Sequence, residues 1–215
     1  MSSREAILGS IRSHLAASLP YDPGESVIPA EASGETPGTT PLVDLFKQSV
    51  EAVDAHCVVA RDEAEIVQAV TRIVADLRAR RIAISDALVL DRLIRLSDVE
   101  ISRDTSNLFE IEVGITTAQA AIAETGTLVL DSARERHRVI SLVPPVHIAI
   151  IDASSIFQTL GEALAFIHQS NDISPAVTFI TGPSRTADIE LTLAIGVHGP
   201  QELYVIVNEG PPLTR

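Results

Sequence analysis

Short apolar runs alternate with amphipathic helical segments from residue 41 onward, and this alternation constrains the fold more than any other feature of the chain. Strands that alternate with helices are typical of a mostly parallel sheet with helices on both faces, so we expect an α/β layered domain. Only 3% of the residues are aromatic and none is tryptophan, which leaves alanine, valine, isoleucine and leucine to fill the core, as in buried parallel strands. The expected strands are residues 56–60, 82–84, 111–115, 127–130, 147–151, 177–180 and 203–207.

Helices are expected between these strands, the first of them over residues 41–54. Asp62 with Glu65, and Ser155 with Gln158, have the spacing of N-terminal helix caps, so each pair predicts a helix that starts there. The alanine-rich stretch 117–123 predicts a further short helix. The last turn of the helix after Asp62 is expected to hold basic residues, which the helix dipole favours; these are Arg78, Arg80 and Arg81.

The first forty residues read as a separate part of the chain. Apolar residues at helical spacing predict an amphipathic helix over residues 4–18, and Pro20 ends it. Residues 20–40 are rich in proline and glycine without periodicity, which predicts a linker. We therefore divide the chain into residues 1–40, a helix and linker, and residues 41–215, the α/β domain. A lone amphipathic helix cannot bury its own apolar face, so it docks either on the main domain or on another chain.

The chain is acidic, with 16 basic and 29 acidic residues and a net charge of −13. Such a surface repels phosphate backbones and anionic lipid, so we expect no nucleic-acid partner. A small anionic ligand remains compatible with this charge, because backbone N–H groups can build a local anion site. No apolar stretch reaches the roughly 18 residues of a membrane helix, and the N-terminal pattern is not that of a signal peptide. We expect a cytoplasmic protein without membrane insertion.

A single cysteine, Cys57, excludes an intramolecular disulfide and any iron–sulfur cluster held by several cysteines of this chain. Its apolar surroundings in the sequence predict a buried small hydrophobe. The histidines show no metal-ligand spacing, so we expect no metal site. The common nucleotide-binding motifs are absent from the sequence, which leaves any cofactor of this chain unknown.

Three polar, glycine-containing segments follow or lie between expected strands, and they hold the candidate site residues. In the first, Glu124 precedes a turn in which a glycine can take positive φ and two hydroxyls can bind a ligand. In the second, Ser184 is expected to cap a helix whose free N–H groups would bind an anion. Both segments also suit ordinary turn chemistry, which needs the same residue types. The candidate ligand-binding residues are Thr125, Gly126, Thr127, Gly182, Ser184, Arg185, Thr186 and Asp188.

The third segment places His198 between two glycines in a loop. Its imidazole titrates near neutrality, so His198 is the first candidate for proton transfer and Glu124 the second. Arg185 would hold an anion, while Asp188 would brace Arg185 or the turn. Ligands of open α/β sheets bind beyond the carboxyl ends of the strands, so we expect the three segments to converge around one pocket at that edge.

These segments resemble the LUD (lactate-utilisation) domain family, and within it the small C-type subunits of lactate-utilisation systems. The matching stretches include AIAETGTL at residues 121–128, TGPSRTADIE at residues 181–190 and GVHGP at residues 196–200, in the expected order. The resemblance implies a fold related to sugar-phosphate isomerases and CoA-transferases. It also implies a role beside iron–sulfur partner proteins in the oxidation of L-lactate to pyruvate. It assigns no catalytic role to an individual residue.

Three functions compete on these observations. The first is the lactate-utilisation subunit, for which the sequence does not establish a catalytic activity of the chain's own. The second is a stand-alone isomerase-like or acyl/CoA-transferase enzyme, in which Glu124 attacks a thioester and N–H groups of the glycine turn stabilise the oxyanion. The third is a regulatory module that only binds an anion.

Overall fold

The computed structural model describes residues 39–104, 107–132, 138–168, 176–187, 193–195 and 199–213. The predicted helix over residues 4–18 lies outside them. The predicted linker also lies outside them, apart from residues 39 and 40, which begin helix α2 (Thr39–Ala52). The division of the chain at residue 40 therefore stays a prediction.

Six strands form one parallel sheet, which confirms the fold class predicted from the sequence. Every strand pair in this sheet is parallel, and β1 and β3 are its two edges. The predicted strand at 111–115 begins two residues later, at Val113. In spatial order the strands are β1 (His56–Ala60), β12 (Glu202–Asn208), β7 (Val146–Asp152), β4 (Val113–Thr117), β2 (Arg81–Ile84) and β3 (Glu100–Ser102).

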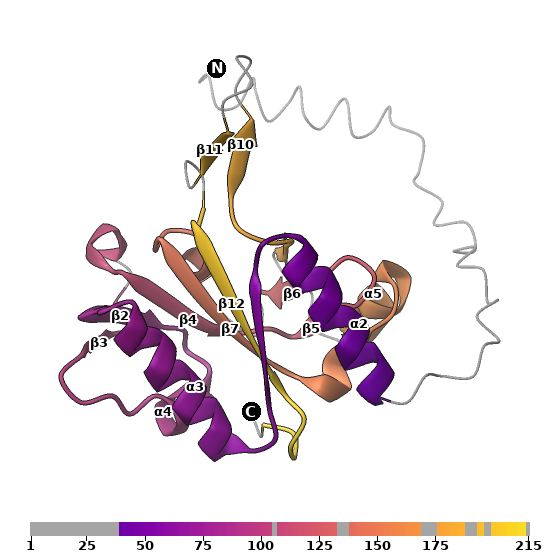
Figure 1. The fold of residues 1–215 in the computed structure, drawn as a ribbon, viewed down its shortest axis with the longest axis horizontal. Helices are drawn as coiled ribbons and strands as arrows, with labels where there is room; N and C mark the ends of the chain where they lie inside the picture. Colours follow the sequence, from indigo (N-terminus) through magenta and orange to yellow (C-terminus); the bar gives the residue numbers. More distant parts are fainter. Residues whose placement is uncertain are drawn as a thin grey trace, which may run out of the picture. The chain divides into compact units, whose positions relative to one another are not determined.

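Helices cover both faces of this sheet (Figure 1). α3 (Glu63–Asp76) and α4 (Leu88–Leu93) lie on one face, and α2 lies on the other. Alternate residues of strand β7 pack against the helices on the two faces of the sheet. Ile148 and Ile150 pack with α3 and α4, while Ala149 and Ile151 pack with α2. Because both faces are covered, the strand reads as a continuous apolar run without alternation.

A second, smaller sheet lies on the α2 side of the molecule, in the order β8 (Ile156–Phe157), β5 (Ala120–Ile122), β6 (Thr127–Asp131) and β9 (Val177–Ile180). The helix predicted over residues 117–123 is wrong, because this stretch forms the end of β4 and then β5. Ala120 packs toward α5 (Leu160–His168) and Ala121 toward α2, and both are fully buried. Small side chains therefore let the strand lie between two helices, and this tertiary packing overrides the helix propensity of alanine.

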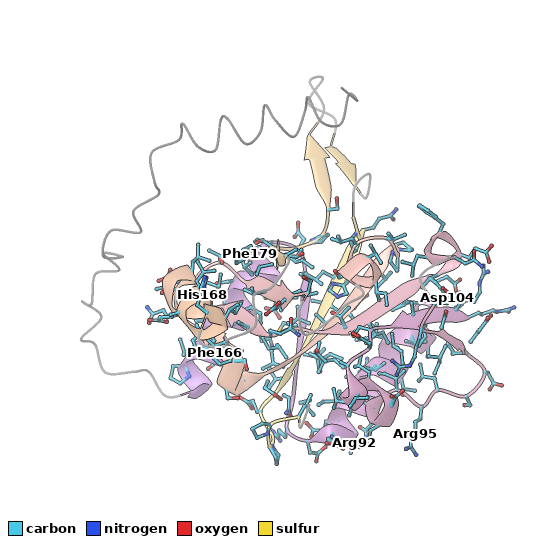
Figure 2. All side chains as sticks on the ribbon, turned by 180° about the vertical axis from the view of Figure 1, so that it is seen from behind. Arg92, Arg95, Asp104, Phe166, His168 and Phe179 are labelled. Atoms are coloured by element: carbon cyan, nitrogen blue, oxygen red, sulfur yellow. The ribbon has the colours of Figure 1, made fainter. Side chains whose placement is uncertain are left out.

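α5 lies on the opposite side of the α/β domain from α4. Figure 2 shows Phe166 and His168, both on α5, far from Arg92 of α4 and from Arg95. The ring of Phe166 packs against that of Phe157 in β8, with ring centroids 5.0 Å apart. The smaller sheet and α5 thus form a layer distinct from α3 and α4.

One of the two predicted helix caps is confirmed. Asp62 accepts a hydrogen bond of 2.8 Å from the N–H of Glu65 at the start of α3. Ser155 does not cap α5, since it lies in a 3₁₀ turn and the strand β8 follows it. Thr159 caps α5 instead, because its hydroxyl accepts a hydrogen bond from the N–H of Glu162 at 3.3 Å. Short 3₁₀ turns span Leu108–Glu110, Arg138–Ser141 and Ala153–Ser155.

The arginines expected in the last turn of α3 lie beyond the helix. α3 ends at Asp76, and Arg78 takes a φ of 53°, which reverses the chain toward β2. The backbone N–H groups of Arg80 and Arg81 both donate to one carboxylate oxygen of Glu112, at 2.6 and 2.9 Å. These two hydrogen bonds lower the pKa of Glu112.

No helix in the described part of the chain has both the length and the apolar character needed to cross a membrane.

Candidate functional site

A cavity of about 190 Å³ opens where three central strands of the large sheet end. Its wall is formed by the segments that follow β2 and β4, by the end of β7, and by the tail after β12. The volume is below the roughly 300–1,000 Å³ of pockets for drug-sized ligands, so the cavity suits a smaller molecule. The lining residues are Asp86, Ala87, Leu88, Val89, Thr117, Ala118, Gln119, Ile150, Asp152 and Leu213.

The topology of the sheet explains why a cavity forms at this point. After β2 the chain enters α4 on one face, whereas after β4 it continues into the smaller sheet on the opposite face. Adjacent strands whose connections leave on opposite faces open a crevice at their carboxyl ends, where ligands of α/β sheets bind. The cavity therefore lies where this fold class places its ligands.

Thr117 and Gln119 supply neutral polar groups to the cavity. Gln119 is only 2% exposed, and its Oε1 accepts a hydrogen bond of 2.7 Å from the N–H of Asp131. Its Nε2 donates to the Thr117 hydroxyl over a longer distance of 3.4 Å. The hydrogen bond from the Asp131 N–H fixes the orientation of the Gln119 amide, so that its nitrogen faces Thr117. A side-chain amide has two donor hydrogens, so Gln119 can also serve a ligand.

Asp152 is held in place by the strand beside it and by the C-terminal tail. Its Oδ1 accepts a hydrogen bond of 2.7 Å from Asn208 Nδ2, and both carboxylate oxygens accept from the N–H of Leu213, at 3.1 and 3.2 Å. Asn208 also donates to Pro211 O at 2.9 Å and accepts from the N–H of Gly210 at 3.0 Å. The tail is thereby folded back, and Leu213 forms part of the cavity wall.

The charge of the cavity is negative. Asp86 and Asp152 are its ionisable lining residues, and no lysine, arginine or histidine belongs to the wall that the structure describes. Arg103, which follows the neighbouring strand β3, donates to Ser85 O at 2.8 Å and pairs with Asp91. A ligand with hydrogen-bond donors fits this lining better than a carboxylate does.

The predicted turn at residues 124–127 lies outside this cavity. Glu124 and Thr125 are exposed, and Gly126 takes a φ of 64° against the backbone of Ser49 in α2. Three hydroxyls meet beside the turn, since Thr127 Oγ1 lies 2.6 Å from that of Thr125 and 2.7 Å from that of Thr181. The structure therefore brings the first and second predicted segments together, through the pairing of β6 with β9.

The second segment does not have the structure expected of it. No helix starts at Ser184, because residues Arg185–Ala187 form strand β10, which pairs with β11 (Leu193–Ile195). The N–H of Ser184 is used in a 2.8 Å hydrogen bond to Pro200 O. The helix predicted to start at Ser184 is thus wrong, while anion binding by this segment stays a prediction. A turn of glycine, proline and serine starts a β-hairpin as readily as a helix.

The predicted site residues also lie at the amino ends of the strands, whereas the sequence predicts them at the carboxyl ends. Pro200 and Gln201 lead into the amino end of β12, and Gly199 packs against the side chain of Ser184. Gly182, with a φ of 76°, packs on Val53, from which the chain enters the amino end of β1. The predicted site residues that the structure describes therefore lie near the amino ends of β1 and β12. Asp188 and His198 lie outside the described residues, as do the side chains of Arg185 and Thr186.

The residues of the cavity are not among those predicted from the sequence. Asp86, Thr117 and Asp152 each stand at or just after the end of a predicted strand, which is the signal that could have identified them. That signal was outweighed by the glycine-containing turns, whose residues suit both turns and ligand sites. The role of Asn208 depends on its register opposite Asp152, which the sequence does not reveal.

Two buried groups lie away from the cavity. His147 in β7 is fully buried, its Nε2 lies 2.9 Å from the Thr116 hydroxyl, and burial lowers its pKa to about 3. Cys57 is buried in β1, and burial raises the pKa of its thiol to about 12. Within the described residues, no three histidine, cysteine or acidic side chains are placed to hold a metal ion.

The fold and the cavity define an α/β protein with a parallel sheet and a ligand crevice at its carboxyl edge. Residues 43–207, most of the chain, match the LUD domain, and the chain therefore belongs to the LUD domain family. The crystal structure of a DUF162 family protein from Deinococcus radiodurans has the same fold. It superposes with a TM-score of 0.60 at 24% identity, over 79% of this chain and 98% of that chain.

Curated relatives match a shorter stretch at higher identity. Lactate utilization protein C of Geobacillus sp. (strain WCH70) is 41% identical over 105 residues, which is 46% of this chain and 44% of the relative. Lactate utilization protein C of Bacillus subtilis (strain 168) is 40% identical over 105 residues, with the same shares covered. The matched stretch thus spans less than half the length of these relatives.

Proposed function

We propose that this chain is a component of a lactate-utilisation system, and that it supports the oxidation of L-lactate to pyruvate beside separate iron–sulfur proteins. The observation that carries this proposal is the 40–41% identity to proteins named Lactate utilization protein C. We also propose that this system works in the cytoplasm.

The chemistry of Cys57 supports the assignment of iron–sulfur clusters to the partners. Clusters are held by thiolates, usually four of them, and this chain has a single cysteine. Burial raises the pKa of that thiol to about 12, so it stays protonated at neutral pH. Any iron–sulfur cluster that carries the electrons of lactate oxidation would therefore be held by other chains.

The cavity at the ends of β2, β4 and β7 is the site to which we assign the chain's own contribution. Asp86 and Asp152 repel the carboxylate of lactate or pyruvate, while Thr117 and Gln119 offer hydrogen bonds. A small molecule with donor groups and no carboxylate is the ligand that this lining favours. A thermal-shift assay should show stabilisation by ethanolamine and not by L-lactate, and Asp86→Asn should reduce it. Stabilisation by L-lactate and not by ethanolamine would overturn this assignment.

Glu124 and the turn at residues 124–127 are the alternative site, either for acyl transfer or for binding an anion, and His198 remains a predicted proton-transfer residue. Incubation of the purified protein with an acyl-CoA and acceptor acids tests acyl transfer by Glu124, since that reading requires a covalent acyl intermediate. The exposed position of Glu124 on a hairpin favours the cavity as the site of action.

Gene deletion tests the proposed function in a host without other lactate dehydrogenases. The deletion strain should fail to grow on L-lactate, grow normally on pyruvate, and recover when the wild-type gene is returned. Unchanged growth on L-lactate would contradict the role in lactate utilisation. Poor growth on both carbon sources would contradict it as well, because the defect would then lie after pyruvate.

A further inference from the structure

Strand β1 is an edge of the large sheet, and its sequence does little to protect that edge. Its five residues, His56–Ala60, contain no lysine, glutamate or proline, and no described strand pairs with its outer side. At about 3.3 Å per residue, they present roughly 17 Å of edge. Edge strands are usually protected by charge, proline or a bulge, because their unpaired N–H and C=O groups accept another strand.

A groove of about 850 Å³ runs along this edge between the end of α2 and the side of α3. Val58, in the middle of the strand, is 37% exposed. The ring of His56 stacks on that of Tyr204 in β12, with ring centroids 4.6 Å apart, and both residues line the groove. The groove therefore combines an open backbone edge with an apolar and aromatic floor.

The rim of the groove is acidic. Glu51, Asp54, Glu65 and Asp76 line it together with Arg72, which lies 3.7 Å from Asp76, while Lys47, outside the lining, lies 3.9 Å from Glu51. The groove thus has a net charge of −3 in a chain whose net charge is −13. Its occupant has to be basic for the charges to complement each other.

Charge also argues against a second copy paired edge to edge and against residues 1–38 as the occupant. A second copy paired edge to edge would bring two acidic rims together, which is repulsive. Residues 1–38 contain two arginines and five acidic residues, so they too carry negative charge. Neither of them complements the rim.

We propose that the β1 edge is a docking site for an extended, lysine- or arginine-containing segment of a partner protein, which pairs with β1 as an additional strand. The backbone of the segment bonds to β1, its apolar side chains cover Val58, and its basic side chains meet the acidic rim. This inference does not depend on the proposed role in lactate utilisation.

Nuclear magnetic resonance on the ¹⁵N-labelled full chain tests the proposal with two synthetic probes. One is a six-residue peptide of alternating lysine and valine, and the other is a six-residue peptide of alternating glutamate and valine. The basic peptide should shift the amide signals of residues 56–60 and bind more weakly as salt rises from about 50 to about 500 mM. The acidic peptide should shift none of them.

Two matched variants localise the binding. Val58 and Ile101 are both 37% exposed, and each is the central residue of an edge strand at opposite ends of the sheet. Val58→Lys should weaken the basic peptide at least about tenfold, while Ile101→Lys should leave its affinity unchanged. If Val58→Lys does not fold, Asp54→Asn combined with Asp76→Asn replaces it, and should also weaken binding.

Three results would overturn the proposal. The first is that the basic peptide leaves the amide signals of residues 56–60 unchanged. Equal binding of both peptides would show that charge does not select the occupant. A wild-type dimer that Val58→Lys converts to a monomer would identify a second copy as the occupant.

Discussion

Asn208 and Asp152 join the carboxyl ends of two neighbouring parallel strands through a hydrogen bond of 2.7 Å. The two residues stand opposite each other in the register of β12 and β7. Asn208 also fixes the tail after β12, and Asp152 lines the cavity. One side-chain pair thus links the geometry of the cavity to the path of the C-terminal tail.

Replacement of Asn208 by alanine should lower the free energy of unfolding by about 2 kcal/mol, since it removes three hydrogen bonds at a buried position. Urea unfolding measures the loss, and hydrogen exchange should show faster exchange of the Leu213 amide. Glu209→Ala, at the exposed neighbouring position, is the control and should change stability by less than about 0.5 kcal/mol. Equal effects of the two variants would contradict the role given to Asn208.

Gly114 and Gly161 should respond to alanine in opposite ways. A Cβ on Gly114 would lie 2.0 Å from the backbone oxygen of Ile140, so Gly114→Ala should destabilise the protein by about 3 kcal/mol or more. Gly161 lies in α5, where a Cβ would make an ordinary contact of 3.9 Å with the Thr159 hydroxyl oxygen, and Gly161→Ala should add up to about 0.5 kcal/mol. Thermal unfolding of both variants measures these two changes in stability. A neutral Gly114→Ala would show that the backbone of Ile140 does not lie against Gly114 in β4.

Burial of His147 makes stability depend on pH. The pKa of its imidazole is about 3 in the folded chain and about 6.5 when unfolded, so the unfolded state binds the proton first. The free energy of unfolding should therefore be unaffected by this group above pH 6.5, and should fall as pH drops from 6.5 toward 3, by up to about 1.4 kcal/mol per pH unit.

His147→Gln removes the titrating group and should flatten this dependence, whereas His168→Gln, at an exposed position, should not. Urea unfolding at a series of pH values measures both. If His147→Gln does not fold, the imidazole signals of the wild-type protein decide the question, since those of His147 should not titrate down to about pH 4.5. Titration near pH 6.5 would contradict its burial.

The Cys57 thiol should resist alkylation while the protein is folded. Burial raises its pKa to about 12, and the thiolate is the reactive form. Iodoacetamide at pH 8 should modify it only after denaturant is added, as mass spectrometry would show. Rapid modification of the folded protein would remove the argument that Cys57 is unsuited to holding a cluster.

The sequence predicted the layered fold because short apolar runs and helical periodicity are local signals. His56–Ala60 and the Asp62 cap match the structure residue by residue. The stretch 117–123 was misassigned because alanine favours helices, and only its position between α2 and α5 makes it a strand. Local pattern does not contain that information.

The candidate site was less predictable than the fold for a related reason. The meeting of Thr127 with Thr181 follows from strand pairing, and the sequence did point to those two segments. The cavity depends instead on which face each connection leaves from, and on the register that sets Asn208 opposite Asp152. Both are properties of the assembled sheet.

Growth on L-lactate with cavity and hairpin variants tests the central claim most directly. The deletion strain would carry Asp86→Asn, Thr117→Val or Glu124→Gln, each of which preserves the size of the side chain. We predict that the two cavity variants slow growth on L-lactate, with growth on pyruvate and the melting temperature unchanged, while Glu124→Gln supports growth like the wild type. Normal growth with both cavity variants and loss of growth with Glu124→Gln would contradict the account and move the site to the hairpin.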